Sequence, residues 1–434
     1  MSRLCQKSEI PFVKKELTVE PRVDPTYKQA NSGPFPIYKT EHDKTIVPRY
    51  WRNQTSIGES FKRMDDFPNF NGTLRDFQTI VVSKTIDMFK TTGGGLMCVG
   101  CGKGKTTMSI ACAVRMRVPT IVLVNKESLG NQWKERINQF APGARIGTLR
   151  ADIVDIEDKH FVIGMIQSVS TKDYPLSYFD RFDMVIVDEA HHLCARVFSR
   201  AMFNMLNVKY TLALSATPDA KNGLRKLVHL FLGPTIVDMR DTRSDVKIIK
   251  KPYRCAQYQL PPPENRIGKT DMTKMINMIS HDPDRTQHIV MIIHEYLNDT
   301  QNHILVLSAL RDHCLEMHRL IGPRLSGLYL GGMKEHELLE SASKRVVIAT
   351  NKMADEGLDI PTLNILLMST PKSDVIQACG RVQRGAGNPI IIDICDIWSV
   401  FIAQSRKRDA YYTQCGWLAP PKKEVKPQKY IFID

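Results

Sequence analysis

The stretch 100–106, which reads GCGKGKT, constrains the fold of this chain more than any other. It follows a short apolar run over 95–99 and leads into an apolar-periodic segment over 108–114. A strand, a glycine-rich loop and a helix in that order form the setting of a phosphate-binding loop. Its glycines let backbone N–H groups turn toward one centre, and the start of the helix adds partial positive charge. The pattern predicts that Lys105 reaches the β- and γ-phosphates of a nucleotide and that the Thr106 hydroxyl ligates Mg²⁺.

A pair of carboxylates further along the chain supports this interpretation. The usual loop has a glycine where this chain has Val99, so a glycine-rich turn without a ligand is the alternative for the loop alone. Asp188-Glu189 follows the apolar run 184–187, and open parallel sheets place ligand groups at the carboxyl ends of their strands. Phosphoryl transfer uses one carboxylate to hold Mg²⁺ and a second to orient or deprotonate water, and Asp188 and Glu189 fit these roles in that order. A helix N-cap is the alternative for the acid pair alone, but loop and pair together predict a nucleoside triphosphatase.

Composition limits the partners and the compartment. The 434 residues carry 60 Lys and Arg against 46 Asp and Glu, a formal net charge of +14. This excess favours nucleic acid as the partner, with a generally basic enzyme as the alternative. The cysteines are scattered singly, which predicts a reducing, intracellular compartment, and the pair Cys98 and Cys101 has no second pair that would complete a zinc site. The chain does not start with a signal peptide, and the apolar stretch 390–403 is interrupted by Asp393 and Asp396, so we expect a soluble protein without a membrane span.

Continuous apolar runs alternate with helical stretches, which predicts α/β architecture with parallel sheets covered on both faces. The expected strands are 95–99, 120–124, 161–166, 184–187 and 210–214, then 303–307, 345–350, 365–368 and 389–392. The expected divisions are an N-terminal accessory module (1–66), a first ATP-binding domain (67–239), a connecting helical segment (240–300), a second domain (301–404) and a basic C-terminal tail (405–434).

Two basic segments outside the expected sheets admit two interpretations each. In the N-terminal module, 36–39 and 45–48 read as short strands. The run 49–52, Arg-Tyr-Trp-Arg, suits phosphate contact with base stacking, and equally suits an aromatic anchor that packs this module onto the next domain. The C-terminal tail is either a solvated charged segment or a further contact to nucleic acid.

The second half of the chain supplies positive charge. Arg381 and Arg384 are three residues apart and share a face if this segment is helical. An arginine brought to the γ-phosphate stabilises charge in the transition state and contributes about 10³–10⁵ in rate. One sheet that holds nucleotide and another that carries an arginine predict closure across a cleft.

With these features in view, the chain from about 74 to 385 resembles superfamily 2 helicases of the XPB-like branch, whose acidic motif is spelled DEAH. The blocks that carry the resemblance are LR-x-x-Q at 74–78, GKGKT at 102–106, VNK at 124–126, IQS at 166–168, DEAH at 188–191, SAT at 215–217, AT at 349–350 with EGLDIP at 356–361, and Q-x-x-G-R-x-x-R at 377–384. The ordered set is most similar to helicases of large DNA viruses, of the poxvirus transcript-release type, and to phage recombination helicases.

The resemblance implies two tandem RecA-like domains with ATP and Mg²⁺ in the cleft between them. It implies 3′→5′ movement along DNA, single-stranded or branched, with RNA as the alternative, and transcription or replication proteins as partners in a host cytoplasm, nucleus or virion. Catalytic roles fall to Lys105, Asp188, Glu189, Gln377, Arg381 and Arg384. Nucleotide contacts fall to Arg75, Gln78, Gly102, Gly104, Lys105, Thr106, Thr107 and Asp359, with Gln78 reading adenine and with Thr106 and Asp188 as magnesium ligands. Nucleic-acid contacts fall to Asn125, Lys126, Gln167, Ser168, Ser308 and Thr350, and coupling to His191, Ser215 and Thr217.

One departure from the family pattern bears on the output. XPB-like helicases continue after the SAT block with an Arg and an Asp before Gly-Leu, and here those places hold Ala220 and Asn222. In the family this element helps to separate strands. We therefore expect translocation, branch remodelling or displacement of bound protein to exceed plain duplex unwinding.

Two competing functions remain open at this point. One is the motor subunit of a restriction-type nuclease, although the candidate nuclease motifs, Glu157-x-Lys159 and Glu424-x-Lys426, lack convincing upstream aspartates. The other is a non-catalytic nucleic-acid-binding module, against which the intact Lys105 counts.

The excess of basic residues predicts a steep salt dependence. Binding to DNA should weaken with rising ionic strength because contacts to phosphates release condensed counterions, and sequence preference should be small because such contacts carry no base information. Fluorescence anisotropy with labelled oligonucleotides at several salt concentrations measures both quantities. A DNA affinity that stays constant between low and physiological salt would contradict this prediction.

Overall fold

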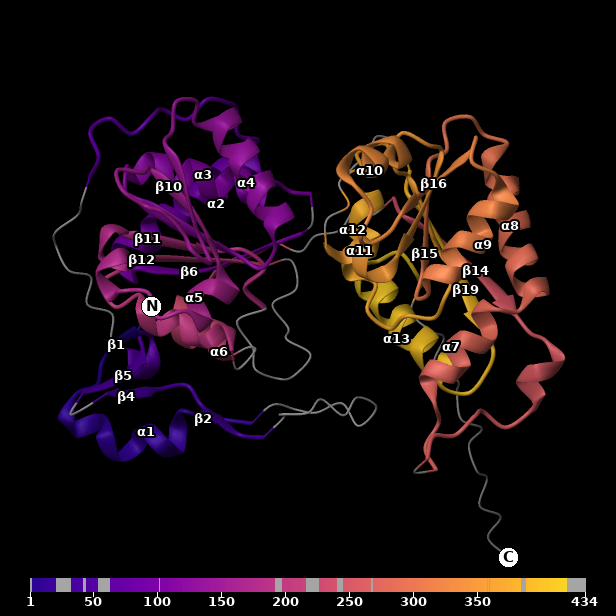
Figure 1. Cartoon of the computed structure of the whole chain (residues 1–434), viewed down its shortest axis with the longest axis horizontal. Coiled ribbons are helices and arrows are strands. Elements are labelled where there is room, and N and C mark those ends of the chain that lie inside the picture. Colours follow the sequence, from indigo (N-terminus) through magenta and orange to yellow (C-terminus); the bar gives the residue numbers. More distant parts are fainter. Residues whose placement is uncertain are drawn as a thin grey trace, which may run out of the picture. The chain divides into compact units, whose positions relative to one another are not determined.

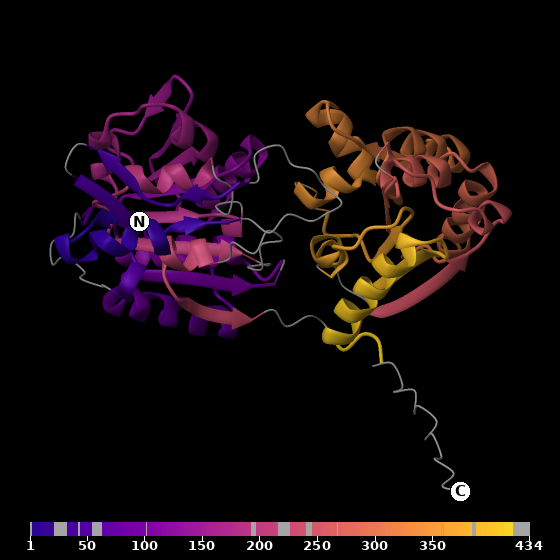
Figure 2. The same ribbon diagram turned by 90° about the horizontal axis from the view of Figure 1, so that it is seen from below.

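The computed structural model divides the chain into two compact units, Met1–Asp241 and Thr242–Asp434, and Figures 1 and 2 show helices on both faces of the large sheet in each unit. The structure describes residues 2–20, 33–41, 44–53, 63–100, 102–191, 197–215, 226–239, 245–266, 268–356, 358, 360–383 and 388–419. The predicted α/β class with two parallel sheets is confirmed.

The first unit is built on an eight-stranded sheet in the order β13-β6-β12-β11-β7-β10-β8-β9. Its strands are β6 (Gly94–Val99), β7 (Thr120–Val124), β8 (Ile146–Arg150), β9 (Ile153–Asp155), β10 (Phe161–Met165), β11 (Met184–Val187), β12 (Tyr210–Ser215) and β13 (Thr235–Met239). Its helices are α2 (Asp76–Thr91), α3 (Lys105–Met116), α4 (Glu127–Phe140), α5 (Ile166–Thr171) and α6 (Lys226–Leu232). All neighbouring strands pair in parallel except β9, which pairs antiparallel with β8.

The two-residue period of the strands divides the core of this unit into two layers. On β6, Met97 and Val99 pack with α2, α3 and α4, whereas Leu96 and Cys98 pack with α5 and α6 on the other face. Both faces are therefore covered, which explains why these strands read as continuous apolar runs rather than as alternating ones.

A small N-terminal module packs against this second layer (Figure 1). It contains a three-stranded antiparallel sheet in the order β1-β5-β4, a helix and a two-stranded pair. The elements are β1 (Ser2–Leu4), α1 (Ile10–Glu16), β2 (Thr18–Val19), β3 (Phe35–Pro36), β4 (Lys39–Glu41) and β5 (Lys44–Pro48). The strand predicted over 45–48 is confirmed, whereas the one predicted over 36–39 is wrong because β4 begins only at Lys39.

The aromatic run after β5 is an anchor. Arg49 donates from Nη1 to the carbonyl oxygens of Val208 (2.9 Å) and Lys209 (2.6 Å), and the Tyr50 hydroxyl lies 3.0 Å from the Thr211 hydroxyl. Tyr50 and Trp51 are buried, so their rings are not free to stack on bases. The anchor interpretation of this run is therefore correct.

The second unit is built on a six-stranded sheet in the order β14-β19-β18-β15-β17-β16, with every neighbouring pair parallel. The strands are β14 (Lys247–Tyr253), β15 (Ile304–Ser308), β16 (Ser326–Tyr329), β17 (Val346–Thr350), β18 (Ile365–Met368) and β19 (Ile390–Asp396). The helices are α7 (Met272–Ser280), α8 (Pro283–Leu297), α9 (Arg311–Ile321), α10 (Glu335–Ala342), α11 (Asn351–Glu356), α12 (Ile376–Val382) and α13 (Val400–Gln414).

Two predicted segments of this unit need correction. The segment 240–300 is not only a helical connector, because β14 pairs along its length with β19 and so forms an edge of the second sheet. The lysines of β14 concealed this strand, since an edge strand tolerates charges that a central strand does not. Residues 405–414 are not tail either, because they belong to α13, which packs through Tyr412 on the same sheet. The other predicted domain boundaries, at residues 66/67, 239/240 and 300/301, stay predictions.

His313 on α9 is a buried titratable group of the second unit. Its Nδ1 lies 3.0 Å from the Ser308 hydroxyl, and its Nε2 lies 3.4 Å from the Thr286 hydroxyl. Burial, together with the nearby positive charge of Arg285 and with His281, lowers the pKa of His313 to about 3. The folded unit therefore keeps this imidazole neutral at pH values where the unfolded chain would take up a proton.

We expect His313 to make the second unit sensitive to acid. Its contribution to the free energy of unfolding is complete above about pH 6.5 and is lost as the pH falls toward 3, by at most about 1.4 kcal/mol per pH unit. The measurement is urea unfolding of the wild type and of His313→Gln, followed by tryptophan fluorescence between about pH 7 and pH 4. The stability advantage of the wild type should shrink steadily with acidification, and a constant difference would contradict the prediction.

Candidate active site

The loop between β6 and α3 is shaped by its glycines and closed by its lysine. Gly102 and Gly104 have φ values of 73° and 84°, in the left-handed region that favours glycine. Lys105 opens α3, and its ammonium group donates to the Val99 carbonyl at 3.0 Å. Its charge therefore lies over the centre of the loop, at the start of the helix. Residue 101 falls outside the described residues.

Gln78 connects α2 to this loop. Its Nε2 donates to the Lys103 carbonyl at 3.0 Å, while its Oε1 accepts from the Arg75 backbone N–H at 2.9 Å. Gln78 is buried, and Arg75 is exposed beside it with its guanidinium 5.6 Å from the centre of the Phe77 ring. In the structure the Gln78 side chain thus supports the shape of the loop. The expected role of Gln78, which is to bind the adenine base, does not include this contact with the loop.

The acid pair and the loop both lie at the carboxyl ends of the strands of this sheet. Strand β12 separates β6 from β11, so Ser215 at the end of β12 lies between the loop and Asp188. The Asp188 carboxylate accepts hydrogen bonds from the Trp133 indole N–H (2.8 Å) and from the Glu189 backbone N–H (2.9 Å). Burial and the neighbouring Glu189 carboxylate raise the pKa of Asp188 to about 6, and Lys105 opposes this shift.

Glu189 has a strained backbone. Its φ of 46° lies in the left-handed region, which residues other than Gly, Asn and Asp rarely adopt. Its Oε2 lies 3.3 Å from Nδ1 of His191, the residue expected to couple nucleotide state to movement.

The donors at this edge fit a hard divalent cation. Mg²⁺ takes oxygen ligands and is usually held by one or two carboxylates together with substrate phosphates. Asp188 offers such a carboxylate, and Thr106 and Thr107 lie half-buried in the first turn of α3. Among the described residues, no group of three or more His, Cys, Asp or Glu side chains could hold a metal ion unaided.

Other expected contacts of the first unit gather nearby. Asn125 and Lys126 follow β7, and Gln167 and Ser168 lie in α5 directly after the neighbouring strand β10. The Gln167 side chain donates to the Asn125 carbonyl at 2.6 Å, so the structure brings these blocks together. The Ser168 hydroxyl accepts from the Ala151 backbone N–H.

The second unit places its expected residues less uniformly. Thr350 is half-buried at the carboxyl end of β17, beside Ser308 at the end of β15. The Ser308 hydroxyl is buried and bonded to His313, and its expected contact with a bound strand stays a prediction. Gln377 and Arg381 lie one turn apart on α12, half-buried, with Arg381 Nε donating to the Ala354 carbonyl at 3.0 Å. Thr217, Ala220, Asn222, Asp359, Arg384, Glu424 and Lys426 lie outside the described residues.

Trp133 is a site residue that the sequence did not indicate. Its place on the apolar face of α4 predicts only a core position, and it is indeed buried. The hydrogen bond to Asp188 spans 55 residues of sequence, and no local pattern signals it. The tryptophan among the apolar residues of α4 was the only sequence signal for this hydrogen bond, because a buried indole N–H requires an acceptor.

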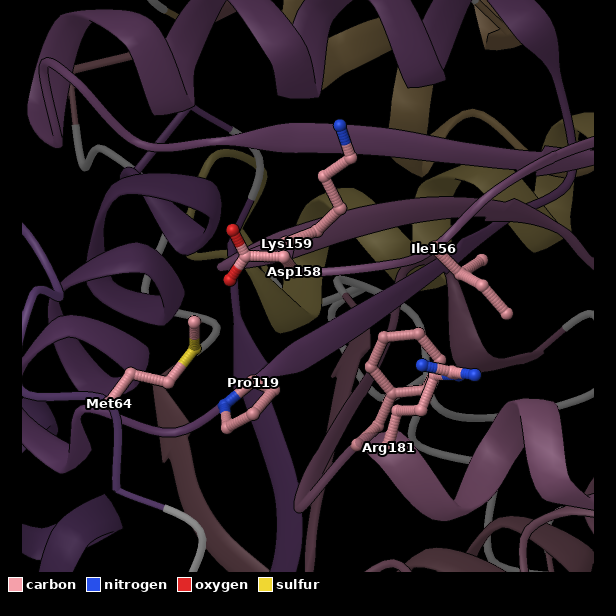
Figure 3. Close-up of a pocket in the computed structure, with 7 residues that line it drawn as sticks. Met64, Pro119, Ile156, Asp158, Lys159 and Arg181 are labelled. Carbon is pink, nitrogen blue, oxygen red and sulfur yellow. The ribbon is translucent and has the colours of Figure 1, made fainter.

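A cavity of about 130 Å³ lies near the amino ends of the strands of the first sheet. Figure 3 shows Met64, Pro119, Ile156, Asp158, Lys159 and Arg181 around it. Pro119 and Lys159 come just before β7 and β10, whereas the nucleotide loop and the acid pair come after their strands. This cavity is therefore separate from the candidate active site.

A glycine-shaped loop at the start of a helix and a half-buried acid pair at the carboxyl ends of the strands of the same parallel sheet define a nucleotide hydrolase of the α/β class. Residues 71–220 match the family model described as the res subunit of type III restriction enzymes. The chain is 30% identical over 431 residues to a protein of Acanthamoeba polyphaga mimivirus named as an ATP-dependent RNA helicase, a match that covers 94% of this chain and 82% of that protein. The chain belongs to this family of ATP-dependent helicases, and it is an ATP-hydrolysing enzyme.

A further relative agrees with this assignment. A protein of Escherichia phage T5 named as a helicase is 26% identical over 357 residues, which cover 76% of this chain and 75% of that protein. The solved structure of T4 UvsW aligns over 95% of this chain and 97% of its own at 14% identity, with a TM-score of 0.40. None of the helices in the described part of the chain is long and apolar enough to cross a bilayer.

The shape of the nucleotide loop predicts a specific sensitivity at Gly104. A Cβ added there would lie 2.4 Å from Gln78 Nε2 and would push this amide away from the Lys103 carbonyl. Gly143 has the same φ of 84° with nothing within 4 Å of an added Cβ, which makes it a matched control for backbone strain. Both alanine variants should lose about 1–2 kcal/mol of stability, but only Gly104→Ala should weaken ATP binding.

Thermal unfolding and titration with a fluorescent ATP analogue separate the two effects. We expect the dissociation constant to rise about tenfold or more in Gly104→Ala, since this loss corresponds to about 1.4 kcal/mol. Equal ATP affinities in the two variants would show that Gln78 and the loop carbonyls do not shape the site.

Proposed function

We propose that this helicase is a Mg²⁺-dependent ATPase that moves 3′→5′ along single-stranded or branched DNA. The observation that carries the proposal is the convergence of Lys105, Asp188 and Glu189 at the carboxyl edge of one parallel sheet. The net charge of +14 supports a polyanionic track, and the 3′→5′ direction rests on the family resemblance. Transcription or replication proteins of a virus are the partners that this activity would suit.

The residues of the first unit divide the chemistry. Lys105 would leave the Val99 carbonyl to bind the β- and γ-phosphates, because phosphate oxygens attract an ammonium group more strongly than a neutral carbonyl does. Asp188 and the Thr106 hydroxyl would hold Mg²⁺, which neutralises charge that develops on the phosphates. Glu189 would orient the attacking water, in a position fixed by its strained backbone.

The second unit would supply positive charge during hydrolysis. The resemblance assigns this role to Gln377, Arg381 and Arg384, of which the first two lie on one face of α12. An arginine acts here only on the transition state, so it raises turnover rather than ATP affinity.

RNA is the second candidate track. The mimivirus relative and one from African swine fever virus, 24% identical over 390 residues, are both named as RNA helicases. A restriction-type nuclease has less support. Glu157 pairs with Arg181, and Lys159 pairs with Asp155. These ion pairs lie near the amino ends of the strands, whereas the acid pair lies at the carboxyl ends.

Removal of either charged group of the active site should abolish turnover without unfolding. Lys105→Ala and Glu189→Gln each delete a charge and little core volume, so we expect the ATPase rate to fall at least about 100-fold with a nearly unchanged melting temperature. Lys159→Ala and Glu157→Gln are matched controls from the opposite edge and should retain full activity. Turnover within a few-fold of wild type in either active-site variant would exclude the assignment.

The nature of the track follows from ATP hydrolysis measured with single-stranded DNA, duplex DNA and RNA side by side. Single-stranded DNA should stimulate hydrolysis most, and displacement of streptavidin from biotinylated ends should occur at the 5′ end, as 3′→5′ movement requires. Strand displacement on long duplexes should be slow. Stimulation by RNA alone would favour the second candidate, and fast processive unwinding would contradict the expected effect of Ala220 and Asn222.

A further inference from the structure

Two arginines of the second unit are buried as deeply as its apolar core. Arg285 on α8 is 0% exposed and Arg408 on α13 is 1% exposed. Each pairs with an aspartate of β19, Arg285 with Asp396 and Arg408 with Asp393. Such pairs are weak evidence for a stabilising role, because apolar residues of similar volume often stabilise a core at least as well.

Arg285 uses its guanidinium on two partners. Nε and Nη2 donate to the two oxygens of the Asp396 carboxylate, both at 2.7 Å, which is the parallel fork geometry of a strong pair. Nη2 also donates to the backbone carbonyl of Ser369 at 2.7 Å. The Tyr258 hydroxyl donates to the same carboxylate at 2.6 Å and completes the cluster.

Arg408 repeats this arrangement from the other face of the sheet. Its Nε donates to Asp393 Oδ2 at 2.8 Å, and its Nη1 donates to the backbone carbonyl of Lys372 at 2.8 Å. Asp393 and Asp396 are three residues apart on β19, so their side chains point to opposite faces. The helices α8 and α13 accordingly belong to different core layers of the second unit (Figure 1).

Both guanidinium groups reach the same segment. Ser369 and Lys372 lie in the loop 369–375, which connects β18 to α12. The start of this loop is further tied to β15, since the Ser369 hydroxyl donates to the Leu307 carbonyl at 2.7 Å and the Ala309 N–H donates to the Thr370 hydroxyl at 2.8 Å. The loop is thus fixed from two faces, directly before the helix that carries Gln377 and Arg381.

We propose that Arg285 and Arg408 are positioning residues for ATP hydrolysis, which hold the loop 369–375 and thereby aim α12. We call the two ion pairs with their loop carbonyls the guanidinium clamp. A planar guanidinium can satisfy a carboxylate and a carbonyl at once, which a lysine ammonium at the end of a flexible chain does less well. A misplacement of about 1 Å at a catalytic group can cost about 100-fold in rate, so the aim of α12 matters for turnover. This inference rests on the proposed role of α12 in hydrolysis.

The test replaces one ion pair of the clamp by apolar residues. In the double variant Arg408→Met with Asp393→Leu no charge is left unpaired in the core, so the fold should be kept, while the Lys372 carbonyl loses its donor. We expect kcat for DNA-stimulated ATP hydrolysis to fall at least about tenfold, with KM for ATP changed less than about twofold. Hydrogen exchange should report faster exchange of amides in 369–376 with unchanged protection of β18 and β19.

Two further variants make the outcomes distinct. Ile293→Ala removes core volume on α8 away from the loop and should lower stability with kcat unchanged, which separates positioning from general destabilisation. Gln377→Ala tests the proposed role of α12 itself and should lower kcat. If Gln377→Ala lowers kcat while the double variant keeps wild-type kcat and loop protection, the clamp is overturned and the proposed function stands. If Gln377→Ala is fully active, the proposed role of α12 fails first.

Discussion

The half-buried carboxylate of Asp188 is the constraint on which the first unit depends. The backbone N–H of Asp188 donates to the Leu123 carbonyl at 3.0 Å, which continues the hydrogen bonds of the sheet beyond the end of β11. The Asp188 side chain lies in the same site as Glu189 and Lys105. A carboxylate in such surroundings is costly unless donors or a cation compensate it. The Trp133 indole and the Glu189 N–H supply part of this compensation, and the rest would come with Mg-ATP.

The second unit also contains buried carboxylates, and their positively charged partners are arginines of the same unit. Its buried carboxylates, Asp393 and Asp396, are each neutralised by an arginine that also contacts the backbone before α12. The half-buried acid of the first unit would therefore be completed by a ligand, whereas each buried acid of the second unit binds an arginine that also contacts a loop.

Sequence reasoning predicted what short-range patterns encode. Continuous apolar runs revealed the central strands. The glycines, Lys105 and the acid pair were predicted to share one end of a parallel sheet, and in the structure they follow strands of the same sheet. The edge strand β14 was missed because solvent on one side relaxes its pattern. Trp133, Arg285 and Arg408 could not be assigned, because their partners lie 55, 111 and 15 residues away and the contacts arise only from packing. Ser308 shows the converse, a residue in the expected block whose hydroxyl the fold has committed to His313.

The division of labour between the units is tested most directly by Arg381→Ala, with fluorescent ATP titration and turnover measured on the same preparation. If the first unit binds the nucleotide and the second acts on the transition state, ATP affinity should stay within about twofold while hydrolysis falls by about 10³ or more. The loss should be larger with DNA than without it if nucleic acid favours the state in which both units act on the nucleotide. A fall of binding and hydrolysis in equal proportion would contradict the account, since Arg381 would then bind ATP in the ground state.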